Sequence, residues 1–209
     1  MKYTFNINQV VKVIPLFILL LACTHRESKS NILQDISDFE NPLIDHFPSQ
    51  TIGLYTAAIS KDNKNDVISA MLLNQYEHIQ YNRVKDSLIR FAKAKYETLD
   101  SCLLIVNMYT NENNFYKSHK TDNLSYLQKD CLKEKLPIPN FWMLGINQTN
   151  IINLPDDFEI YVFKASHDTI NEKYLSKNAL MPSYWKHGYS KGIATNDSTK
   201  EVIYWFVIW

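Results

Sequence analysis

The stretch that decides the fold is residues 189–209, YSKGIATNDSTKEVIYWFVIW. Two β-rich runs, residues 189–195 and 201–209, flank Asn196-Asp197-Ser198-Thr199, four residues with strong turn chemistry. In the last run the apolar side chains alternate between two faces, with Val202, Tyr204, Phe206 and Ile208 on one and Ile203, Trp205, Val207 and Trp209 on the other. A strand that is apolar on both faces is covered on both sides. The sequence therefore predicts a C-terminal β-hairpin inside a sheet.

Working outward from the hairpin, four more segments are typical of strands: residues 51–60, 101–109, 141–146 and 158–164. Helical spacing of apolar residues indicates helices at 32–39 and 124–136, and a much longer one over 67–99. The apolar stripe of that long helix comprises Ile68, Leu72, Ile79, Val84, Leu88 and Phe91. We therefore expect an α+β domain, with an antiparallel or mixed sheet of five to six strands packed by one long helix.

At the other end of the chain, residues 13–23 read VIPLFILLLAC and follow Lys2 and Lys12. A helix needs about 20 apolar residues to cross a bilayer, so this run is too short to span one. A charged segment, a short apolar run and a small residue before the cleavage point are typical of a signal peptide. The alternatives are an ordinary secretory peptide without an anchor, or a short buried strand.

The cysteine at the end of this run favours an anchored protein. Leu20-Leu21-Ala22-Cys23 resembles the lipobox of bacterial lipoproteins, whose cysteine is acylated and becomes the first mature residue. The resemblance covers residues 1–23 and implies a lipid on Cys23 that holds the protein on a membrane. It divides the chain into a signal peptide (1–22), a lipidated cysteine with a polar tether (23–30) and a single α+β domain (31–209). Because Glu27 is the one acidic residue of the tether, we expect the periplasmic face rather than the cell surface.

Composition narrows the class of ligand. The chain is 45% hydrophobic and 13% aromatic, which is enough apolar surface for a real core. It has 22 basic and 22 acidic residues, so removal of Lys2 and Lys12 leaves 20 against 22. Nucleic-acid binding calls for a basic excess or stripe, and the sequence has neither. The four glycines form no phosphate-binding loop, and we expect no cofactor.

With Cys23 lipidated, Cys102 and Cys131 are the two remaining cysteines. In an oxidising envelope they can form one disulfide. Both fall on apolar stretches and are expected to point inward, which suits a bridge and equally suits two buried free thiols.

Two pairs of residues are candidates for catalysis. Ser183-Tyr-Trp-Lys186 matches Ser-x-x-Lys, the nucleophile and base spacing of penicillin-binding proteins and β-lactamases, although the Lys-Thr-Gly motif of that family is missing. His167 and Asp168 form the second pair, suited to acid-base chemistry. The six histidines show no metal-ligand spacing, so we expect no metal site.

Aromatic residues concentrate late in the chain, and Trp142, Tyr184 and Trp185 are the candidates for an exposed binding surface because loops flank them. We favour a membrane-anchored envelope lipoprotein with a non-catalytic domain that binds a protein or glycan, including an immunity or inhibitor role. The alternative is a small envelope hydrolase that uses Ser183 and Lys186, or His167 and Asp168.

Overall fold

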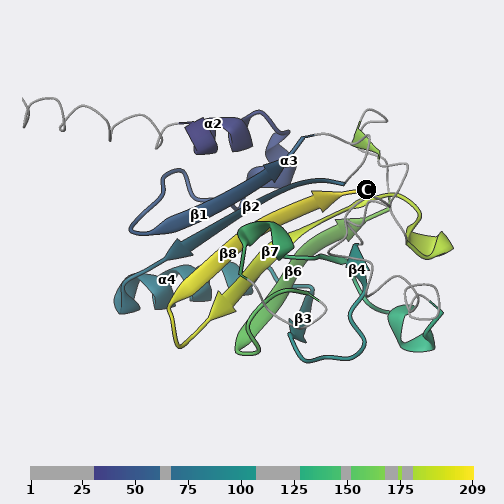
Figure 1. The fold of residues 1–209 in the computed structure, drawn as a ribbon. Helices are drawn as coiled ribbons and strands as arrows, with labels where there is room; N and C mark the ends of the chain where they lie inside the picture. Colours follow the sequence, from purple (N-terminus) through teal and green to yellow (C-terminus); the bar gives the residue numbers. More distant parts are fainter. Residues whose placement is uncertain (1–30, 62–66, 107–127, 147–151, 168–173, 176–180) are drawn as a thin grey trace, which may run out of the picture.

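The structure, a computed structural model, describes residues 31–61, 67–106, 128–146, 152–167, 174–175 and 181–209. Its centre is a six-stranded antiparallel sheet with the strand order β1-β2-β8-β7-β6-β3 (Figure 1). The strands are β1 (Tyr55–Ser60), β2 (Ile68–Gln75), β3 (Ala94–Glu97), β6 (Phe158–Ser166), β7 (Tyr189–Asn196) and β8 (Glu201–Ile208). The expected fold class is confirmed: an α+β domain whose C-terminal hairpin, β7-β8, lies in the middle of the sheet.

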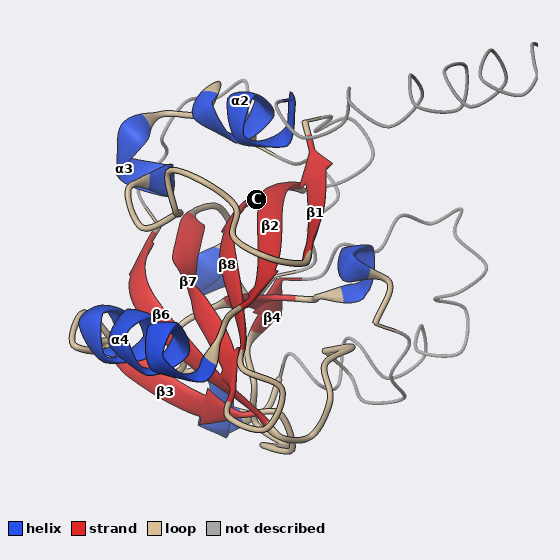
Figure 2. Cartoon of the chain, turned by 90° about the vertical axis from the view of Figure 1, so that its left-hand side faces the viewer, coloured by secondary structure: helices blue, strands red, loops and turns tan. Residues whose placement is uncertain are grey.

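Different layers cover the two faces of this sheet (Figure 2). Three helices cover one face: α2 (Asn31–Ser37), α3 (Asn41–Ile44) and α4 (His78–Ile89). The other face packs against a two-stranded parallel sheet, β4 (Ile105–Val106) with β5 (Ile138–Pro139), and against the 3-10 turns η3 (Asp130–Leu132), η4 (Trp142–Leu144) and η6 (Ser183–Trp185). Among the described residues, no helix is both long and apolar enough to cross a bilayer.

The β7-β8 hairpin contributes side chains to the hydrophobic cores on both faces of the sheet. In β8, Trp205 and Val207 pack into the core on one face, and Tyr204 and Phe206 into the core under the helices. The turn begins one residue later than predicted, because Asn196 pairs with Glu201 and so belongs to β7. The Asn196 carboxamide oxygen then accepts hydrogen bonds from the backbone N–H groups of Ser198 and Thr199, which closes the turn.

The long helix predicted over residues 67–99 is wrong in extent. The segment forms β2, then the twelve-residue helix α4, and finally β3. In β2 the run from Ile68 to Leu72 is buried at every position because both faces of this inner strand are covered. A fully buried strand loses the alternation that distinguishes it from a helix, and Ile68 and Leu72 also satisfy helical spacing.

Other segments were predicted with mixed success. Helix α2 and strands β1 and β6 lie within or close to their predicted ranges. The strand predicted at 101–109 is the two-residue β4, and residues 107–109 lie outside the described residues. In the segment predicted as helix 124–136, the described part contains only the single turn η3, and the strand predicted at 141–146 is the turn η4. Turn η4 is stabilised at its start, because the Asn140 carboxamide oxygen accepts a hydrogen bond from the Trp142 backbone N–H.

One glycine lets the two central strands and β6 come together. A Cβ built on Gly192, in the middle of β7, would lie 2.0 Å from the backbone oxygen of Tyr161 and 2.8 Å from the Trp205 ring. The neighbouring register shift between Val162 and Lys164 in β6 marks the same crowded place. Glycine is needed here for close approach.

We predict that Gly192→Ala lowers the free energy of unfolding by about 2 to 3 kcal/mol, because the backbone of β6 must move to admit the methyl group. Urea denaturation of the two proteins measures the difference. The control is Gly145→Ala, where the added Cβ meets nothing within 4 Å and the cost is that of a φ of +69° in alanine, about 1 kcal/mol. Equal losses at the two positions would contradict the packing argument.

Candidate functional site

The structure places three of the four predicted catalytic residues on the surface. Ser183 lies in η6 and Lys186 directly follows it, and both side chains are exposed. Among the described residues, no hydrogen bond joins the two side chains, so the Lys186 amine is not in place to take a proton from the Ser183 hydroxyl. His167 is exposed with its ring edge-on to Trp185, 5.5 Å between ring centres, and Asp168 lies outside the described residues. Ser183 and Lys186 are therefore not assembled as a catalytic pair.

The three predicted binding aromatics lie on two separate turns. Trp142 is half-buried in η4, and Tyr184 is 42% exposed in η6. Trp185 is buried against Trp209, whose indole N–H donates to the Trp185 carbonyl at 2.7 Å. Trp185 is therefore part of the core, and Tyr184 is the most exposed of the three.

Cys102 and Cys131 form a disulfide, with 6.1 Å between their Cα atoms. Cys102 is half-buried, but Cys131 is exposed at the surface, so the expectation that both point inward is wrong for Cys131. The bridge ties the segment that follows β3 to η3, 29 residues further along the chain.

Beside this bridge, an open cleft of about 460 Å³ lies along β3. Its lining residues are Lys95, Tyr96, Glu97, Leu99 and Asp100. Leu99 is 67% exposed, whereas Tyr96 beside it in the lining is 7% exposed. The cleft therefore offers apolar surface within a charged rim.

Polar contacts hold the wall of the cleft in place. Asp100 accepts Lys135 at 3.0 Å and the Cys102 amide at 2.7 Å. Burial alone would raise the pKa of Asp100, but these two donors hold it below its usual value. The Tyr96 hydroxyl accepts the Leu136 amide, and burial raises the pKa of Tyr96. At neutral pH the cleft thus holds an ionised, already paired carboxylate and a protonated phenol, which suits binding better than proton transfer.

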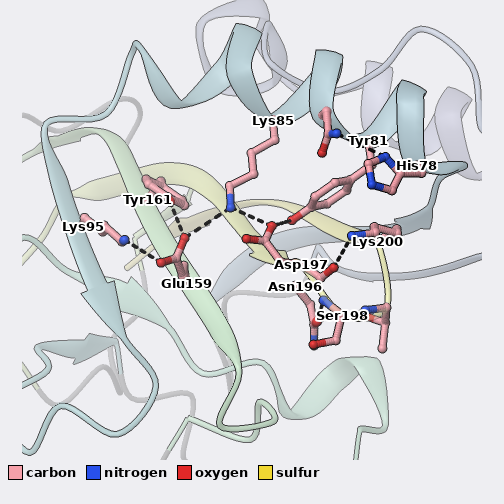
Figure 3. A network of polar contacts seen from close by, with 12 residues as sticks. His78, Tyr81, Lys85, Lys95, Glu159, Tyr161, Asn196, Asp197, Ser198 and Lys200 are labelled. Atoms are coloured by element: carbon pink, nitrogen blue, oxygen red, sulfur yellow. Dashed lines mark hydrogen bonds and ion pairs between the residues drawn. The ribbon is translucent and has the colours of Figure 1, made fainter.

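A second polar cluster joins α4 to the sheet (Figure 3). Lys85, from α4, bonds Asp197 of the hairpin turn at 2.7 Å and Glu159 of β6 at 3.4 Å. Tyr81, one turn earlier, donates to the same Asp197 carboxylate. Lys95, from β3, pairs with Glu159. The carboxylates of Glu159 and Asp197 thereby connect α4, β3, β6 and the turn of the β7-β8 hairpin.

The titration of this cluster indicates a structural role. Hydrogen bonds from Lys85 and Tyr81 lower the pKa of Asp197. Burial and then the neighbouring carboxylates raise the pKa values of Tyr81 and Tyr161. Both tyrosines therefore remain protonated donors at neutral pH, and both carboxylates are occupied acceptors.

A buried polar group under α3 was missed by sequence reasoning. The His46 side chain is 6% exposed, and its Nε2 lies 3.1 Å from the carbonyl oxygens of both Gly192 and Trp205. Because two carbonyls accept there, Nε2 carries the proton. Lys191, whose side chain is 8% exposed, donates to Asp45 at 2.5 Å and to the Pro42 carbonyl.

This group fastens the α2-α3 segment to the centre of the sheet. Burial, and then the charge of Lys191, lower the pKa of His46 to about 4, so the ring is neutral near pH 7. Its Nδ1 is buried without a hydrogen bond among the described residues, and lies 3.6 Å from Asp45. The signal available in the sequence was Lys191, a charge placed between apolar residues on one face of β7.

No group of three or more potential metal ligands occurs among the residues that the structure describes. No family model, curated protein or solved structure matches this chain. The function must therefore be argued from the chemistry of the chain itself.

We predict that stability falls as the pH drops from about 6.5 towards 4, because the unfolded chain binds a proton at His46 that the folded chain excludes. Between these values the unfolded state carries more protons, so the loss accumulates with acidification and reaches about 2 to 4 kcal/mol. Urea midpoints measured from pH 7 to pH 5 give the slope.

His46→Gln should flatten this slope whatever its effect on stability at pH 7. The matched control is His78→Gln, at an exposed position of α4, which should leave the slope unchanged. An unaltered slope in His46→Gln would contradict the assignment.

Proposed function

We propose that this protein is an exported lipoprotein of a bacterial cell envelope, held on a membrane by lipid on Cys23, whose α+β domain binds a partner. The observation that carries the proposal is the Cys102–Cys131 disulfide. Disulfides persist in oxidising compartments and are rare in the cytosol. The bridge therefore supports export independently of the resemblance of residues 20–23 to a lipobox.

The state of the polar side chains supports binding over catalysis. Ser183 and Lys186 do not contact each other, and the buried His46 directs its Nε2 proton at backbone carbonyls. The carboxylates of Glu159 and Asp197 are already paired with lysines. These candidate side chains, all within the described residues, are thus either separated or occupied.

The cleft along β3 is the position that best suits a partner. Leu99 presents apolar surface between ion pairs, an arrangement of apolar centre and charged rim that is found at protein interfaces. Sugar recognition relies on exposed aromatic faces, whereas Tyr96 in the cleft is 7% exposed. A protein partner is therefore favoured over a glycan, which is in keeping with an immunity or inhibitor role.

We predict that the full-length protein, expressed in a bacterial host, loses residues 1–22, gains acyl mass and pellets with membranes. Cys23→Ala should keep its signal segment and gain no acyl mass, because the thioether cannot form. Intact mass spectrometry and membrane fractionation measure both. A wild-type protein that keeps its N-terminus, or that is released in soluble form, would contradict the proposed lipid anchor on Cys23.

We predict that a photoreactive amino acid at position 99 gives a discrete cross-linked adduct in cells of the native host, because the exposed Leu99 side chain would lie in the interface. The matched control is the same amino acid at Ile79, which is 75% exposed on α4 and does not line the cleft. Adducts are read by mass on gels and by peptide sequencing. Equal labelling from both positions, or none from position 99, would contradict the assignment of the cleft.

A further inference from the structure

The sheet ends on one side at β1, and the outer side of this strand is unpaired among the described residues. The Gln75 amide donates to the Leu54 carbonyl, and β1 pairs with β2 from Tyr55↔Asn74 to Ser60↔Ser69. Hydrogen-bonded and non-hydrogen-bonded pairs alternate along an antiparallel ladder. The even-numbered residues of β1 therefore bond β2, and the N–H and C=O groups of Tyr55, Ala57 and Ile59 point away from the sheet.

The two edges of the sheet differ in how they are protected. Natural edge strands are usually kept from pairing by short length, charged residues, proline or a bulge. The opposite edge, β3, has four residues and carries Lys95 and Glu97. β1 has six residues, YTAAIS, with no charge and no proline, and its register to β2 is regular. The nearest charge, Lys61, is paired with Asp35 and Asp38.

We propose that a second copy of this chain pairs with β1 along this edge, strand to strand and antiparallel, about a two-fold axis at Ala57. This placement puts Ala57 opposite Ala57 of the second copy and Tyr55 opposite Ile59. It forms about six backbone hydrogen bonds from groups that have no partner among the described residues. The two sheets then become one continuous sheet across the axis.

The side chains of β1 are self-complementary in this register. An aromatic residue opposite a β-branched one is a favourable cross-strand pair, and the small Ala57 keeps the axis clear of clashes. On the other face Thr56 lies opposite Ala58, again without charge. An isologous contact of this kind closes after two copies and so forms a dimer instead of a fibre.

The expected dimer is weak. One pair of six-residue strands buries less than a standard interface, which places the contact in the transient class. The inference rests on the geometry of β1 alone and stands whether or not Cys23 carries lipid. A lipid anchor would raise the local concentration and favour the dimer.

The test combines molar mass with amide exchange on the full chain, purified from whichever cell fraction carries it, with excess micelles if detergent is required. Light scattering over roughly micromolar to millimolar concentrations should show monomers turning into dimers. Amides of Tyr55, Ala57 and Ile59 should exchange at least about tenfold more slowly as dimers form, while those of Thr56 and Ala58 stay protected throughout. A monomer at every concentration, or a dimer without the alternating protection, overturns the proposal.

Ala57→Pro is the matching variant, because proline removes an outward N–H without removing a bond to β2. It should raise the dimer dissociation constant at least about tenfold at an unchanged melting temperature, whereas Ala57→Val, which keeps the N–H, should stay within about threefold. Dimerisation of a folded Ala57→Pro protein at the wild-type concentration would refute the register. If the proline variant does not fold, the exchange pattern of the wild type decides.

Discussion

The structure depends on one constraint: the hairpin of β7 and β8 is buried on both faces. Every residue of β7 is buried, and so is β8 from Val202 to the end of the strand. Such a pair cannot stand alone, because each face needs its own apolar cover. The helices α2, α3 and α4 supply one cover and the η turns with β4 and β5 supply the other. The remaining strands extend the sheet on either side of this pair.

Burial on both faces also explains the unusual residues of the centre. A charged side chain on β7 cannot reach water through a covered face, so Lys191 needs a partner within the protein, which Asp45 provides. The same segment contributes His46, whose ring bonds the backbone of both hairpin strands. The α2-α3 segment is therefore held on the sheet by polar contacts as well as by apolar packing. Acidification weakens these polar contacts, because it protonates His46.

Sequence reasoning succeeded where local chemistry and burial agree. The hairpin was recognisable from Asn196-Asp197-Ser198-Thr199 between apolar runs, and β6 from its β-branched and aromatic content. It failed for β2 because a strand buried on both faces has no alternation, and because Ala70, Met71 and Leu72 are equally at home in a helix. Sequence reasoning missed β3 because a strand of four residues is too short to show a clear alternation of apolar and polar residues. The β2 error comes from long-range burial that no local window contains, and the β3 error from the shortness of the strand.

The site shows the same division. Ser183 and Lys186 have the right spacing along the chain, but spacing cannot specify that their turn is a short 3-10 segment on the surface. Trp185 looked exposed because loops flank it, whereas the indole of Trp209 from the end of β8 draws it into the core. The His46 group, which sequence reasoning missed, is assembled from segments far apart in the chain. The cleft at Leu99, also missed, is lined by residues from the segment 95–100, but the contacts that brace it come from Lys135 and Cys131. A domain that buries its hairpin so completely leaves the edges of the sheet, and the loop that the Cys102–Cys131 disulfide braces, as its accessible backbone. That is why we place the proposed binding surfaces there and not at the centre.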